Sequence, residues 1–81
     1  MESILKNVAK FRKEKGLTYE NMALELGIST PAYRKIEVGK TQLTVERLYQ
    51  IADILQVKIA IILEIQTENY HQTNKDTATG F

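Results

Sequence analysis

Glycines divide the apolar residues of this chain into short stretches, each with helical spacing. Apolar residues recur every three or four positions within residues 3–15, and Gly16 follows where a left-handed cap would end a helix. A second stretch begins after Thr18 and stops at Gly27, barely two turns later, and a third stops at Gly39. The pattern predicts a compact all-α domain of four to five short helices.

Residues suited to N-caps precede the later helices. Ser29 or Thr30 can cap the third helix, and if Thr30 does so, Pro31 becomes the first helical residue, where its missing N–H costs nothing. Thr44 can cap a fourth helix, whose apolar stripe runs to about Leu55. We therefore expect a helix to start at each of these polar residues.

The period of the apolar residues changes after the fourth helix. Every second residue is now apolar, and isoleucine is frequent; the residues concerned are Val57, Ile59, Ile61, Leu63 and Ile65. Two-residue spacing favours a β-strand over 57–65. A lone strand leaves its backbone groups unpaired, so this strand would pair with its copy in a second chain, and Val57, Ile59, Ile61 and Leu63 would form a dimer interface. A short fifth helix is the competing interpretation.

The last part of the sequence is polar and poor in aliphatic residues. It cannot bury enough apolar surface to offset the entropy lost on ordering, so we expect residues 67–81 to be a disordered tail. Residues 1–66 would then be the single folded domain.

Composition excludes several classes of protein. There is no cysteine among the 81 residues, which removes disulfide scaffolds and thiolate catalysis and fits a cytoplasmic location. The single histidine, His71, lies in the polar tail without other candidate ligands around it. No apolar stretch is long enough for a signal peptide or a membrane span. We expect neither an enzyme nor a protein with a metal, a cofactor or a membrane partner.

Positive charge is concentrated in the first half of the chain. The net charge is only +1, but residues 1–45 hold eight basic and five acidic side chains, whereas residues 46–81 hold three and five. This distribution places the excess of cations in the half that contains the second and third helices. It is compatible with a solvated lysine-rich face and with a surface that contacts nucleic acid.

Two short helices joined by a turn at Gly27 indicate DNA binding. A helix of this size fits the major groove and presents side chains from its first turns to base edges, while the preceding helix lies across the backbone. Residues 7–56 resemble the helix-turn-helix domain of the lambda-repressor and Cro family, also called the xenobiotic-response-element family. The helix-turn-helix itself would span residues 18–37. The residues that match the family are Thr18, Ala23, Leu26, Gly27, Ile28, Ser29, Ile36, Glu37 and Gly39.

The resemblance implies roles for individual residues. Base-reading positions on the third helix are Thr30, Pro31, Arg34 and Lys35. DNA-backbone positions are Thr18, Tyr19, Ser29, Lys40, Thr41 and Gln42. Arg12 and Glu37 match a structural salt bridge. Tyr19 and Val38 depart from the glutamine and the polar residue common in the family, and Val38 cannot bind a phosphate through its side chain.

The expected function is that of a sequence-specific regulator of transcription. The resemblance implies a repressor that binds double-stranded DNA as a homodimer on a pseudo-palindromic operator. The alternative is a protein-binding module, either an adaptor or an antitoxin that keeps this scaffold and holds a toxin or another protein partner. RNA binding is less favoured, because no pair of exposed aromatic residues on a sheet is evident.

Overall fold

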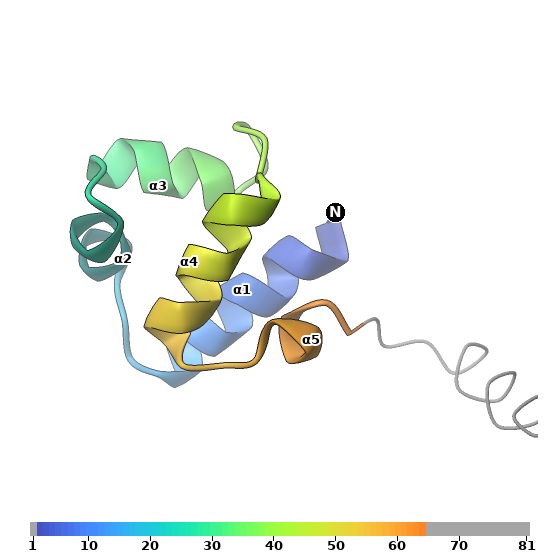
Figure 1. Ribbon diagram of the computed structural model, residues 1–81. Helices are drawn as coiled ribbons and strands as arrows, with labels where there is room; N and C mark the ends of the chain where they lie inside the picture. Colours follow the sequence, from blue (N-terminus) through green and yellow to red (C-terminus); the bar gives the residue numbers. More distant parts are fainter. Residues whose placement is uncertain (1, 65–81) are drawn as a thin grey trace, which may run out of the picture.

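Five helices follow one another along residues 2–64, the part of the chain that this computed structural model describes (Figure 1). They are α1 (Glu2–Glu14), α2 (Tyr19–Leu26), α3 (Thr30–Glu37), α4 (Val45–Leu55) and α5 (Ile59–Ile62). The prediction of an all-α domain of four to five helices is confirmed. The predicted tail over 67–81 lies outside the described residues. No helix within residues 2–64 has the length and apolar character needed to cross a membrane.

Hydroxyl side chains start three of the helices. The Thr18 hydroxyl accepts from the N–H of Asn21, whose side chain accepts from the N–H of Thr18 in return, so both ends of a capping box are made. Ser29 caps α3 and Thr44 caps α4 in the same way. Since the cap of α3 is Ser29, Pro31 is the second residue of the helix. Each cap satisfies one N–H that the helix itself leaves unpaired.

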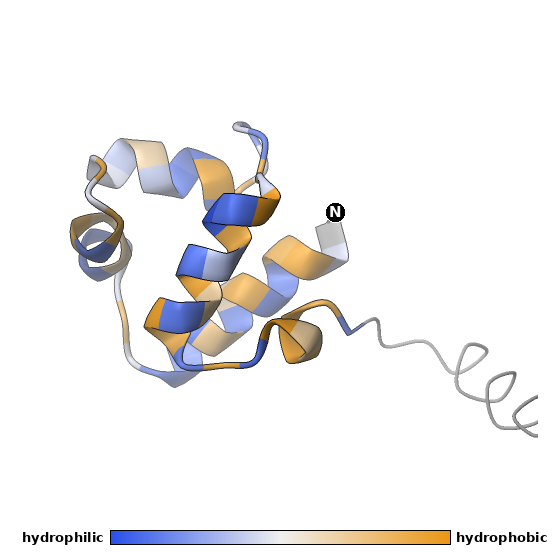
Figure 2. Ribbon diagram, viewed as in Figure 1, coloured by the Kyte–Doolittle hydropathy of each residue, from blue (hydrophilic) through white to orange (hydrophobic). Residues whose placement is uncertain are grey.

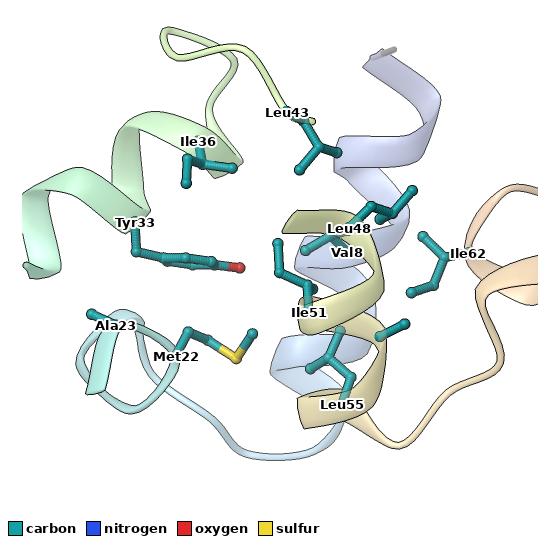
Figure 3. Packing of buried hydrophobic residues seen from close by; sticks show 11 residues of the cluster. Val8, Met22, Ala23, Tyr33, Ile36, Leu43, Leu48, Ile51, Leu55 and Ile62 are labelled. Atoms are coloured by element: carbon teal, nitrogen blue, oxygen red, sulfur yellow. The ribbon is translucent and has the colours of Figure 1, made fainter. Parts of the chain in front are cut away.

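The hydrophobic core lies where the five helices meet (Figure 3). In Figure 2, apolar and polar stretches alternate along α1 and α4, as expected for helices that bury one face. α2 and α3 pack on each other, α2 also packs on α4, and α1 contacts α3, α4 and α5. The buried apolar side chains are Val8, Met22, Ala23, Tyr33, Ile36, Leu43, Leu48, Ile51, Ala52, Leu55 and Ile62. Because this core draws on every helix, it fixes α2 relative to α3.

The predicted strand over 57–65 is wrong for the residues that the structure describes, because the chain forms α5 instead. A lone strand would leave its backbone groups unpaired, whereas this helical turn pairs its own, with the N–H of Leu63 donating to the carbonyl of Ile59 at 3.0 Å. The Asn7 side chain of α1 then donates to the carbonyls of Ile62 at 2.7 Å and Glu64 at 3.0 Å. A side chain of α1, distant in sequence, thus satisfies the carbonyl groups at the end of α5.

A helix distributes the four predicted dimer residues differently from a strand. Ile62, which the two-residue pattern would turn away from the other apolar residues, is fully buried. Val57 and Ile59 are half-buried against the core. Ile61 and Leu63 remain exposed, at 44% and 43% of their surface. The four side chains therefore do not form one continuous stripe.

We predict that shortening Ile62 destabilises the domain more than shortening its neighbour. Ile62→Val should lower the free energy of unfolding by about 0.5–1.5 kcal/mol, because it removes a fully buried methyl group. Ile61→Val, at an exposed position, should change it by less than about 0.5 kcal/mol. Urea unfolding followed by circular dichroism measures both. The reverse order would mean that residues 57–63 alternate as in a strand.

Candidate nucleic-acid interface

One side of α3 is buried and the other faces solvent. Tyr33, Ile36 and Glu37 point into the domain. Pro31, Arg34 and Lys35 are exposed, at the three- and four-residue spacing that places side chains on one side of a helix. Thr30, the first residue of α3, is half-buried. Three of the four base-reading candidates thus share an exposed helical face.

A buried ion pair holds α3 on its buried side. Arg12 of α1 and Glu37 of α3 are only 8% and 7% exposed. Arg12 Nε donates to Glu37 Oε2 at 2.9 Å, and its Nη2 donates to Oε1 at 3.0 Å, so the guanidinium holds both carboxylate oxygens. Its Nη1 donates to the carbonyl of Leu17 at 2.8 Å. The structure thus forms the expected pair, and the pair joins α1 to the C-terminal end of α3.

Tyr33 joins this ion pair in a buried cluster, which the sequence did not reveal. The sequence pattern identified it only as an inward-facing residue, but its hydroxyl donates to Glu37 Oε2 at 2.6 Å, one turn further along α3. Burial, and then the hydrogen bond to Glu37, raise the pKa of Tyr33 well above its ordinary value, so the hydroxyl stays a donor. The hydrogen bond to Glu37 likewise raises the pKa of Arg12. The four-residue spacing from Tyr33 to Glu37 was the available signal.

Tyr19 covers the cluster from the start of α2. The Arg12 guanidinium carbon lies 4.6 Å from the centre of the Tyr19 ring, a cation–π distance, and the rings of Tyr19 and Tyr33 are 6.0 Å apart. The ring of Tyr19, a residue predicted to contact the DNA backbone, therefore packs on Arg12.

The first turn of α2 has unpaired N–H groups. Among residues 2–64, the N–H groups of Tyr19 and Glu20 have no acceptor, as is usual in the first turn of a helix. These N–H groups can donate to a bound anion, which the positive end of the α2 dipole also favours.

The other candidate backbone residues lie at helix starts and in one loop. The hydroxyls of Thr18 and Ser29 accept hydrogen bonds as caps, which leaves their own protons available to a phosphate. Lys40, Thr41 and Gln42 follow α3 in an exposed loop. The N–H groups of Lys40 and Thr41 both donate to the carbonyl of Lys35, at 2.8 and 3.0 Å. This loop is thereby held against the end of α3.

No metal site is evident in residues 2–64. The described part of the chain contains no group of three or more histidine, cysteine, aspartate or glutamate residues that could hold an ion. His71 lies outside the described residues.

We predict that removing the Arg12 guanidinium costs more stability than removing the whole cluster. Arg12→Met leaves the Glu37 carboxylate buried and poorly compensated, so the free energy of unfolding should fall by about 3–5 kcal/mol. The matched control, Arg12→Met/Glu37→Leu/Tyr33→Phe, replaces all three polar groups with apolar ones and should be the more stable of the two variants. Urea unfolding compares them. A single variant as stable as the wild type would contradict a structural role for the pair.

Comparisons with known proteins agree with this architecture. The model of a helix-turn-helix family matches residues 8–62, which include every helix except the first turns of α1. An uncharacterized HTH-type transcriptional regulator, YqaE, of Bacillus subtilis strain 168 is 41% identical over 58 residues, covering 72% of this chain and 50% of that protein. The cryptic phage CTXphi transcriptional repressor RstR of Vibrio cholerae serotype O1 is 41% identical over 56 residues, covering 69% and 50%.

The chain therefore spans about half the length of these curated relatives. No solved structure gives a significant match. The family match covers well over half of the chain and includes both helices of the motif with the turn between them. This chain belongs to the lambda-repressor and Cro-like helix-turn-helix family, also called the xenobiotic-response-element family.

Proposed function

We propose that this chain is a sequence-specific, double-stranded DNA-binding regulator of transcription that represses as a homodimer, with α3 in the major groove. The observation that carries the proposal is the exposed face of α3, where Pro31, Arg34 and Lys35 face solvent while the opposite side is locked into the core. A fixed helix with free side chains on one face suits the reading of base edges. Repressor activity is supported by the name of the Vibrio cholerae relative.

The four proposed reading side chains offer three kinds of contact. Arg34 and Lys35 can donate to O6 and N7 of guanine. Pro31 offers apolar contact only, which suits a thymine methyl group. Thr30 carries a hydroxyl that can bond a base or a phosphate. Two donors and one apolar contact give each monomer few specific hydrogen bonds, so the paired half-sites of a dimer would add to the specificity.

The backbone contacts lie near both ends of α3. The cap residue Ser29 is at its start. The unpaired N–H groups at the start of α2, near Thr18 and Tyr19, lie close to its C-terminal end, since Tyr19 and Val38 line one groove, and the loop of Lys40, Thr41 and Gln42 follows that end. Phosphate contacts at both ends would fix the register of α3 without carrying sequence information.

The dimer contact is proposed on α5 in place of the strand. Ile61 and Leu63 are the exposed apolar residues there, since Val57 and Ile59 pack partly on the core. In related two-fold arrangements the half-site centres lie about 34 Å apart, one turn of DNA, or a multiple of that. A pseudo-palindromic operator with this spacing is expected.

We predict that Arg34→Ala/Lys35→Ala strongly reduces sequence preference. Removing each base contact should cost about 1–3 kcal/mol of discrimination between the operator and other sequences. The operator is first selected from random DNA with the wild type, and affinities are then measured at moderate salt. The matched control, Lys10→Ala/Lys58→Ala, removes the same charge from α1 and from the N-cap of α5, and should retain the preference.

Two results together would refute the proposal. These are the absence of any enriched sequence with the wild type and an unchanged affinity for DNA after Arg34→Ala/Lys35→Ala. The adaptor or antitoxin interpretation would then be favoured, because it requires the scaffold and not the cations of α3.

We predict that Ile61→Glu/Leu63→Glu yields a monomer, because it places two carboxylates in the proposed apolar contact. Size-exclusion chromatography with light scattering measures the mass. Leu24→Glu, at an α2 position that is 79% exposed, is the control and should leave the dimer intact. Substitution is preferable to truncation after Leu55, because truncation would remove buried Ile62 from the core. A dimer that survives in the double variant would place the interface elsewhere.

A further inference from the structure

A groove opens beside the C-terminal end of α3, between α1 and the start of α2. Its volume is about 300 Å³, and the residues that matter here are Lys6, Arg12, Lys13, Tyr19, Glu37 and Val38. The buried cluster described above lies along it, and the exposed lysines Lys6 and Lys13 belong to α1. We call this the α1–α3 groove.

The charge of the α1–α3 groove is positive. Arg12 and Glu37 neutralise each other, and both oxygens of the carboxylate are already occupied by Arg12 and Tyr33. The lysines are therefore left as the excess charge, with no other acidic side chain in the lining. A second groove, of about 470 Å³, has the opposite character, because Glu25 and Asp53 line it without a cation. Of the two, the α1–α3 groove is the one that suits a polyanion.

The α1–α3 groove continues the exposed face of α3. Val38 follows Arg34 and Lys35 at helical spacing, is 45% exposed and lines the groove. The side chain of Val38 cannot donate a hydrogen bond, and its N–H is already used by the carbonyl of Arg34 at 3.0 Å. A DNA strand passing beside α3 would therefore find no donor on Val38. The nearest cations in the groove are those of α1.

Lys6 and Lys13 lie on one face of α1. They are seven residues apart, which corresponds to two helical turns and to about 10 Å along the axis. Ala9, between them on the same face, also lines the groove and has a short side chain that leaves room. Two lysines at this spacing along the helix, each with a flexible stem, can reach separate phosphates of one strand.

Building on the DNA-binding function proposed above, we propose that Lys6 and Lys13 hold the DNA backbone along the α1–α3 groove and supply the phosphate contacts that Val38 cannot make. The two lysines act as point charges on flexible stems, so they add affinity that does not depend on sequence. They leave base reading to α3. α1, which the helix-turn-helix itself does not include, thereby becomes part of the DNA-binding surface.

The test compares Lys6→Ala/Lys13→Ala with the charge-matched Lys10→Ala/Lys58→Ala, on the selected operator duplex and on a scrambled duplex of equal length. Lys10 lies on α1 over the Phe11 ring and outside the groove lining. The groove variant should bind both duplexes more weakly by a similar factor, roughly tenfold or more at low salt. Its plot of log affinity against log salt should be less steep by about 4 for the dimer, because in each of the two protomers two phosphates are no longer neutralised by a lysine. The sequences that it selects should be unchanged.

Lys6→Arg/Lys13→Arg keeps both charges and should restore the affinity, which separates charge from folding. The inference is overturned if the groove variant and its matched control have the same affinity and the same salt dependence. It is also overturned if the weakening is confined to the operator, because the lysines would then be reading bases. The proposed function fails separately, if the wild type selects no sequence and Arg34→Ala/Lys35→Ala leaves the affinity for DNA unchanged.

Discussion

The position of α3, the proposed reading helix, depends on a buried ion pair. Arg12 and Glu37 connect α1 to α3, and Tyr33 closes the hydrogen bonding of the carboxylate. A charge pair of this kind adds little net stability over an apolar equivalent, but it tolerates few alternative geometries, because a misplaced partner leaves a buried charge unpaired. For a helix that is proposed to present side chains to DNA at a fixed angle, such intolerance is useful. The surrounding apolar core stabilises the domain, and the ion pair fixes the orientation of α3.

Features set by neighbouring residues could be predicted from the sequence. The glycine stops and the hydroxyl caps depend on local backbone geometry, and the left-handed conformations of Gly16, Gly27 and Gly39 agree with the predicted helix ends. The Arg12–Glu37 pair was found through family resemblance, since the two residues lie 25 positions apart. The surroundings of the pair could not be predicted from the sequence. Neither the packing of the Tyr19 ring over Arg12 nor the groove beside Val38 follows from the spacing of residues alone.

Residues 57–64 show why an alternating pattern can mislead. The alternation is real, but it does not place the four residues on one face, because Val57 and Ile59 contact the core while Ile61 and Leu63 remain exposed. What decides the conformation is Ile62, whose burial depends on the other helices, and Asn7, whose amide binds the carbonyl groups at the end of α5. Both contacts cross most of the sequence. Local propensity contains no information about them.

The amide of Asn7 has a geometric consequence for the assembly. α1 holds α5 through Asn7 and holds α3 through Arg12, so one continuous helix of 13 residues connects the proposed dimer contact to the proposed reading helix. A helix is a stiff rod with a fixed rise. If the proposed dimer is joined through α5, the stretch of α1 from Asn7 to Arg12 would fix each α3 relative to the dimer contact, and so contribute to the spacing between the two halves of the operator.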